Sequence, residues 1–136
     1  MAFKHGKDFA FLLGTDDLSS FSDNIEWKRT RDTGETTTAG KDDRTYLAGL
    51  RESSFTVTGK FDSIATTGPR AVLNAALATD TLTVAKIREE GTGVGLPEIE
   101  VSCICTGYTE SIPVGDIIKW SADFQGTGVV DLTAQA

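Results

Sequence analysis

The sequence predicts a mostly β protein: a β-sandwich or partly open barrel of six to eight antiparallel strands with one short flanking helix. Two observations support this prediction. Apolar and polar residues alternate along several separate segments, as they do in strands that bury one face. Only one segment of the 136-residue chain places its apolar residues at helical spacing. The length fits one domain, so residues 1–136 are expected to fold as a single unit.

The alternation is clearest in the segment that follows residue 50. Phe55, Val57 and Phe61 share one face, while Thr56 and Thr58 point to the other. Similar patterns or short apolar runs bounded by turn residues recur along the chain. The expected strands cover residues 9–14, 22–31, 50–62, 81–89, 98–108 and 116–125, with a last short strand at 128–132.

One helix is expected over about residues 69–78. Its sequence, PRAVLNAALA, begins with a proline that suits the first turn of a helix. Val72, Leu73 and Leu77 fall on one side at helical spacing. A helix of this length covers only part of a sheet, so we expect it to pack against one face of the strands.

A polar segment interrupts the strands between residues 28 and 45. Its sequence, KRTRDTGETTTAGKDDRT, contains Ala39 as the only apolar side chain. It carries five basic and four acidic residues, whereas the rest of the chain carries eight basic and sixteen acidic ones. Long connections are uncommon in compact domains and are usually functional or disordered. We therefore predict a long polar loop over about residues 28–49 and interpret it as a hairpin arm that binds a partner.

The sequence offers little support for catalysis, metal binding or a cofactor. His5 is the only histidine and lies in a polar N-terminal stretch. Cys103 and Cys105 lie two apart on one strand, where small buried thiols are the expected state. The glycine-rich Gly91–Gly95 lacks the lysine and following helix of a phosphate loop. We predict a protein that is not an enzyme and needs no cofactor or metal.

The overall charge and hydropathy limit the possible partners. A net charge of −7 disfavours nucleic acid held by phosphate contacts, which require clustered lysine and arginine. No segment approaches the roughly 20 apolar residues of a membrane span. Neither a basic nucleic-acid interface nor a membrane span is therefore expected.

Three blocks of sequence resemble the phage major tail proteins, the subunits of tail tubes. The first is Asp17-Leu18-Ser19 before a polar strand, and the second is Ala48–Ser53 leading into a strand that ends at Gly59–Asp62. The third runs from Val114 to Gly128, VGDIIKWSADFQGTG. Their order and spacing, with the polar segment and one helix between them, make the resemblance cover most of the chain.

The resemblance implies a structural virion protein that forms hexameric rings stacked into a tube, a channel for DNA during ejection. Many tail tube proteins carry an extra immunoglobulin-like domain or a long C-terminal arm. This chain departs from that pattern, and a single tail-tube domain over residues 1–136 with no additional C-terminal domain is expected. Expected partners are the subunit itself, tail tip or baseplate proteins and tail terminator proteins, with DNA passing through unbound. The expected location is the virion, after assembly in the host cytoplasm.

In such tubes the long loop reaches the neighbouring ring. By resemblance, the inter-ring residues here would be Arg29, Arg31, Asp32, Glu35, Lys41, Asp42, Asp43 and Arg44. An acidic lumen would repel DNA phosphates and let the DNA slide. The candidate lumen-facing acids are Glu98, Glu100, Asp116 and Asp123, and ordinary solvent-facing carboxylates are an equal alternative.

Two other functions stay open. The inner tube of a contractile or secretion-type injection system shares the fold and is not separable by sequence. A monomeric β-sandwich that binds a ligand, such as a carbohydrate, belongs to a different class. That class predicts a monomer with an exposed aromatic patch, and the few tryptophans fall on apolar strand faces.

Overall fold

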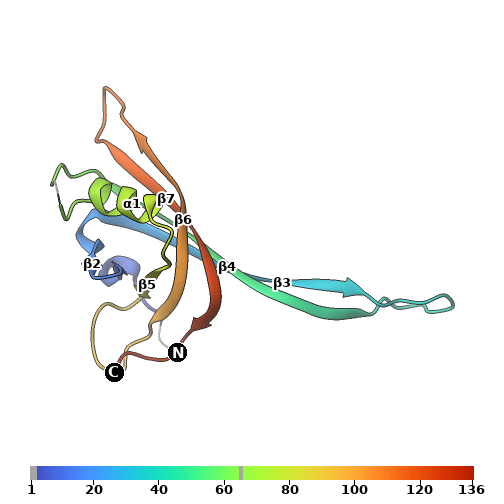
Figure 1. The fold of residues 1–136 in the computed structure, drawn as a ribbon. Coiled ribbons are helices and arrows are strands. Elements are labelled where there is room, and N and C mark those ends of the chain that lie inside the picture. The colour runs from blue at the N-terminus through green and yellow to red at the C-terminus, as the bar shows by residue number, and fades with distance from the viewer. Residues whose placement is uncertain (1–2, 65) are drawn as a thin grey trace.

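A computed structural model describes residues 3–64 and 66–136, and within them it contains seven strands and one α-helix (Figure 1). The strands are β1 (Ala10–Leu13), β2 (Asp16–Asp17), β3 (Ser22–Glu35), β4 (Tyr46–Lys60), β5 (Thr83–Arg88), β6 (Ile99–Ser111) and β7 (Lys119–Asp131). The α-helix α1 spans Pro69–Ala78, and two short 3₁₀ turns cover Gly6–Asp8 and Ser19–Phe21. The strands form one antiparallel sheet in the order β2-β1-β5-β6-β7-β4-β3. The predicted fold class is confirmed, and the sheet is open.

The sheet folds over so that strands distant in the sheet order share one core. Phe11 of β1 meets Phe55 of β4 and Phe124 of β7 with ring centroids 6.1 and 6.3 Å apart. The rings of Phe55 and Phe124 stack at 4.7 Å. Edge-to-face and stacked pairs of this kind add to the gain from burying apolar area. The aromatic cluster therefore holds the two halves of the folded sheet together.

The predicted helix forms over the expected residues and covers part of the core. Pro69 occupies its first turn, and Val72 and Leu73 are buried. Arg70 fastens the helix to β6 through a forked ion pair with Glu110, with donor–acceptor distances of 2.9–3.1 Å. The same guanidinium lies 4.6 Å from the centre of the Phe61 ring.

Most strand ends differ from the predictions: β4 begins at Tyr46 instead of residue 50, and β7 begins at Lys119 instead of residue 116. In two places the strands themselves differ. The expected short strand at 128–132 is the end of β7, because pairing with β6 continues through a bulge to Glu100 opposite Asp131. Between the expected strands at 9–14 and 22–31 lies the two-residue strand β2, which pairs back on Leu12 and Leu13. Such brief pairings leave no period-two signal in a sequence.

Both cysteines are buried free thiols, as predicted. Burial raises the pKa of Cys103 to about 12 and also raises the pKa of Cys105. Because the thiolate is the reactive form, we expect alkylation of the native protein at pH 8 to be on the order of 100-fold slower than in denaturant. Mass spectrometry of iodoacetamide-treated samples measures this difference. Equal rates in the native and denatured protein would contradict the burial of both thiols.

Candidate assembly interface

The hairpin of β3 and β4 leaves the body of the sheet and projects as an isolated two-stranded arm (Figure 1). β4 pairs with β7 only between Ser54 and Lys60, whereas its pairing with β3 continues to Tyr46 opposite Glu35. Residues 29–52, which we call the arm, therefore have no strand pairing with β7. An isolated two-stranded hairpin is marginally stable in water, so this arm is suited to contact another surface.

Most of the predicted polar loop is paired strand, which supports its interpretation as a hairpin. Only residues 36–45 lie between the two strands. The base of this turn is closed by a hydrogen bond of 2.8 Å from the Thr36 N–H to the Thr45 carbonyl. The Thr45 N–H in turn donates to the Thr37 hydroxyl at 2.8 Å. The arm thus has a defined shape nearly to its end.

The predicted inter-ring residues are all exposed along this arm. Within residues 3–64 and 66–136, none of them takes part in an ion pair; they are Arg29, Arg31, Asp32, Glu35, Lys41, Asp42, Asp43 and Arg44. Arg31 lies directly opposite Arg51, a residue that the sequence interpretation did not include. Like charges directly opposite on a hairpin repel each other. The arm therefore presents charges that have no ion-pair partner among the described residues.

The arm also exposes apolar side chains that the sequence interpretation missed. Tyr46, Leu47 and Leu50 belong to the first part of β4 and are exposed. Leu50 is 82% exposed, so most of its apolar area faces solvent. Tyr46 and Leu47 lie inside the expected loop of 28–49, and Leu50 follows it directly. This position was the available signal, because apolar residues in or beside a polar loop suggest a contact.

The sheet face opposite the core is polar across β4 and β7. Asp123 is exposed there and accepts a 2.9 Å hydrogen bond from the Thr56 hydroxyl. Asp23, which was not among the candidates, accepts from Thr58 at 3.1 Å and lies 3.6 Å from the Lys60 ammonium. This face therefore carries hydroxyl groups and both signs of charge on a paired sheet.

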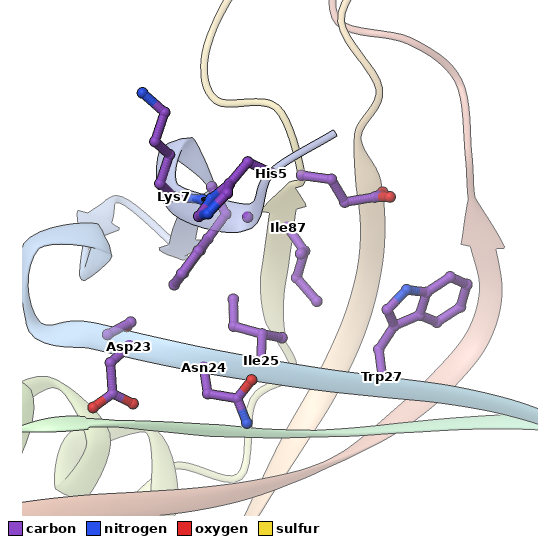
Figure 2. A pocket seen from close by; sticks show the side chains of 11 residues that line it. His5, Lys7, Asp23, Asn24, Ile25, Trp27 and Ile87 are labelled. Atoms are coloured by element: carbon purple, nitrogen blue, oxygen red, sulfur yellow. Dashed lines mark hydrogen bonds between the residues drawn. The ribbon is translucent and has the colours of Figure 1, made fainter. Parts of the chain in front are cut away.

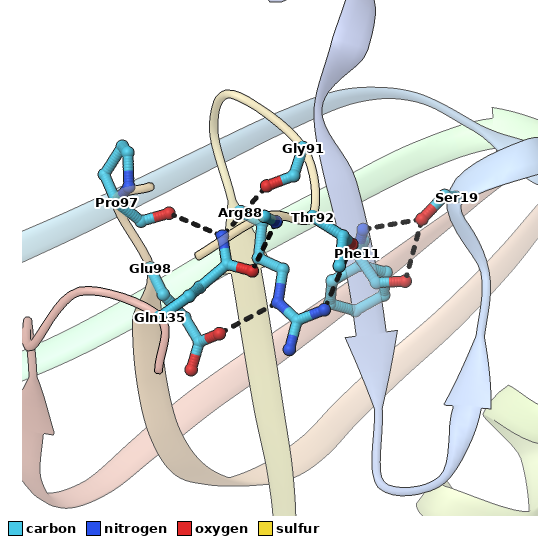
Figure 3. A network of polar contacts seen from close by, with 9 residues as sticks. Phe11, Ser19, Arg88, Gly91, Thr92, Pro97, Glu98 and Gln135 are labelled. Carbon is cyan, nitrogen blue, oxygen red and sulfur yellow. Dashed lines mark hydrogen bonds and ion pairs between the residues drawn. The ribbon is translucent and has the colours of Figure 1, made fainter. Parts of the chain in front are cut away.

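The four candidate lumen acids do not form one cluster. Glu98 is buried and binds Arg88 at 2.8 Å (Figure 3). Glu100 is half-buried opposite Asp131, whose pKa is lowered by hydrogen bonds from the Thr133 hydroxyl and N–H. Asp116 belongs to the exposed β6–β7 turn at the far end of the sheet. The acids thus occupy separate places, with Asp123 alone on the polar face of β7.

A crevice of about 540 Å³ lies where the open edge of β3 faces the N-terminal segment (Figure 2). Its walls include Ile25, Trp27 and Ile87, with His5 and Asp23 among its polar groups. In the part of the chain that the structure describes, no three His, Cys, Asp or Glu side chains gather into a metal-binding group. No helix there is long and apolar enough to cross a bilayer. The crevice therefore lies between the edge strand β3 and the N-terminal segment of an open sheet.

No protein-family model matches this sequence, and no curated protein matches it. Solved structures do match, across nearly the whole chain. The tail of an empty gene transfer agent particle with C6 symmetry has a TM-score of 0.76 at 15% identity, covering 97% of this chain and all of that chain. This chain has the tail-tube fold. The SPP1 tail tube gives a TM-score of 0.75 at 11% identity, over 96% of this chain and 80% of the other.

The tail-tube fold also relates this chain to injection machines. The sheath-tube complex of an extracellular contractile injection system, PVC, matches with a TM-score of 0.71 at 16% identity. The match covers 95% of this chain and 90% of that chain. The resemblance of the three sequence blocks to tail tube subunits is confirmed at the level of the fold.

Proposed function

We propose that this chain is a structural, non-catalytic subunit that assembles into hexameric rings, and that the rings stack into a tail tube. Residues 1–136 act in this role as a single tail-tube domain. The observation that carries the proposal is the arm. Residues 29–52 extend away from the core with exposed charges and apolar side chains that have no function in an isolated monomer. The C6 symmetry of a tail with the same fold supports a six-membered ring.

The open sheet supports closure between subunits. β3 is a long edge strand, and one side of its backbone is free for pairing. A repeated heterologous contact closes into a ring when the rotation between neighbouring subunits is a whole-number fraction of a full turn. Joining six such sheets would cover these edges and leave a wide channel, as in barrels of many strands. The arm is then free to contact the adjacent ring.

DNA is the proposed cargo of the channel. Six copies at −7 each place a charge of −42 on a ring, which disfavours binding of phosphates to the wall. The polar β4–β7 face with Asp123 is the proposed wall. Structures of the same fold include a virion of a gene transfer agent, which supports the proposed location in a virion. Assembly in the host cytoplasm is part of the same proposal. Tail terminator and baseplate proteins are the proposed end partners, since terminator and baseplate assemblies also match this fold.

An inner tube of a contractile injection system is the second candidate. The PVC sheath-tube complex favours it, because its tube shares this fold at similar coverage. Such a tube would lie inside a sheath, and its cargo would differ.

Electron microscopy of the purified protein tests the proposed function. We expect rings or tubes with a central hole at high protein concentration, and sixfold averages in end views. Size-exclusion chromatography with light scattering provides the control at low concentration, where subunits or single rings should dominate. A strict monomer at every concentration would contradict the proposal and favour a monomeric ligand-binding module.

Charge reversal on the proposed wall gives a separate prediction. Replacing Asp123 with lysine should leave tubes intact but slow DNA release from assembled particles, because phosphates would then bind the wall. Fluorescent detection of released DNA measures the rate. The matched control is Asp80→Lys, which changes the same charge at an exposed position after helix α1. Normal DNA release from the Asp123→Lys variant would contradict an acidic lumen at this position.

A further inference from the structure

A crevice of about 580 Å³ lies where the arm separates from the end of β7. We call it the fork; its lining includes Arg29, Arg31, Leu50, Arg51 and Val129. The base of the fork is tight. A Cβ on Gly126 would clash with Ser53, whose carbonyl oxygen accepts a 3.0 Å hydrogen bond from the Gln125 amide. Close packing and this hydrogen bond therefore hold β4 against β7 at the base of the fork.

The fork combines positive charge with exposed apolar groups. In the body, the core face of β3 carries Ile25 and Trp27; by strand alternation, the same face carries Arg29 and Arg31 in the arm. Three arginines and Glu52 line the fork, so its charge is net positive on an acidic protein. Of these four charged side chains, only that of Arg31 makes a hydrogen bond within the described residues. Its Nε donates to the Gly49 carbonyl at 3.1 Å.

The opposite end of the sheet carries a complementary surface. The turn between β6 and β7, residues 112–118, which we call the tip, exposes Ile112, Val114 and Ile117. Val114 is fully exposed, and Ile112 is 69% exposed. Asp116 is the only charged residue of the tip. One of its oxygens accepts from the Ile117 N–H at 2.7 Å, and the other lies 4.0 Å from Lys119, so the carboxylate remains exposed.

The two surfaces lie at opposite ends of one strand. β7 begins beside the tip at Lys119 and reaches the fork at Val129. Its 13 residues span about 40 Å at the usual strand rise. A shift of one copy along this strand direction brings its tip to the fork of the next copy. A contact between different surfaces, repeated in this way, generates an open filament.

We propose that the tip of one copy docks into the fork of a second copy in the adjacent ring. Asp116 then meets the arginines of the fork, while Ile112, Val114 and Ile117 cover Leu50 and Val129. The proposal rests on the proposed tube function. It names the fork, at the base of the arm, as the surface that binds the adjacent ring. Buried apolar area stabilises this contact, and the charge pairing sets its register.

Disulfide trapping tests the proposal with the full chain. Val114→Cys and Val129→Cys place one thiol on each surface, and the native thiols are buried. Because the contact is heterologous, each single variant alone should give no cross-link on oxidation. Mixing the two variants should give a disulfide-linked dimer, and the double variant should give a ladder of linked chains in assembled tubes.

Charge exchange provides the second arm of the test. Asp116→Arg and Arg51→Asp should each reduce tube formation at least about tenfold, and the combined variant should restore it. Asp80→Arg is the control for added positive charge and should leave assembly unchanged. Hydrogen exchange on wild-type tubes should show protection of residues 112–118 and 128–130 relative to the free subunit.

The outcomes separate this inference from the proposed function. Tubes without the mixed cross-link and without protection of the tip would overturn the inference and leave the tube function standing. If the cysteine variants fail to assemble, the wild-type hydrogen exchange decides the same question. A protein that forms no tubes at all would overturn both. Salt-sensitive binding of duplex DNA to the fork, lost in Arg51→Asp, would assign the arginines to DNA and overturn the docking proposal.

Discussion

Replacing residues 32–50 with the dipeptide Asn-Gly should give a folded protein that forms no tubes. Arg31 and Arg51 lie directly opposite each other, so a two-residue type I′ turn can join them without altering the strands before and after. The removed residues are exposed except for the half-buried Thr37, and the first buried residue of β4 is Ser53. We therefore expect the free energy of unfolding to change by less than about 1 kcal/mol.

Loss of assembly follows because the replacement removes the turn, six of the eight predicted inter-ring residues and Leu50. Removing a set of contacts worth about 2.7 kcal/mol weakens an association about 100-fold. Electron microscopy should show no tubes at 100 times the concentration at which the wild-type chain polymerises. Circular dichroism and thermal unfolding check that the body of the sheet is intact.

A control in the same arm tests whether a small change to the turn is enough to block assembly. Thr38→Ala alters an exposed side chain at the turn without changing charge or length. We expect this variant to form tubes as the wild-type chain does. Long tubes from the Asn-Gly replacement would show that the arm is dispensable and would contradict its assignment to the inter-ring contact.

Sequence alternation predicted most of the sheet because the core strands bury one face. Residues 50–62 illustrate this: Phe55 and Val57 are buried, and Thr56 and Thr58 are half-buried on the other face. The helix at 69–78 was equally predictable from its proline and its apolar spacing. The arm was predicted as a polar loop because both faces of an isolated hairpin are solvated, which leaves no period-two pattern in the sequence.

The site was less predictable, because its residues depend on partners distant in the sequence. Alternation groups Glu98 with Glu100 on a polar face. In the structure Glu98 is buried against Arg88, which extends from the neighbouring strand β5. Arg51 shows the converse case: its position opposite Arg31 follows from a bulge in the hairpin register that no local pattern reveals. Pairing register therefore determines which charges meet and which stay exposed.

Gly59→Ala should destabilise the protein by about 3 kcal/mol or more. Gly59 lies in β4, where a Cβ would clash with the Phe21 carbonyl oxygen and lie 2.8 Å from Cζ2 of Trp120. Neither neighbour is free to move. Phe21 belongs to the second 3₁₀ turn, and the buried Trp120 indole donates a 3.1 Å hydrogen bond to the Lys60 carbonyl. Overpacking against such fixed groups forces shifts of the backbone or of the side chains.

Gly34→Ala is the matched control, because it makes the same substitution in the partner strand of the same hairpin. No atom lies within 4 Å of a Cβ at Gly34, and its backbone does not require positive φ. Alanine there should be neutral or stabilise the protein by about 0.5–1 kcal/mol, since glycine loses more backbone freedom on folding. Urea unfolding followed by tryptophan fluorescence measures both variants.

Equal stability of the two variants would contradict the packing at Gly59. A large difference would show that glycine is required where the second 3₁₀ turn and β7 close against β4. Tube assembly separates this role from that of the arm. Gly34→Ala should still form tubes, because its change adds one methyl group and alters no charge. Gly59→Ala should lose tubes only under conditions in which the subunit itself unfolds, since its neighbours lie in the core and contact no part of the arm.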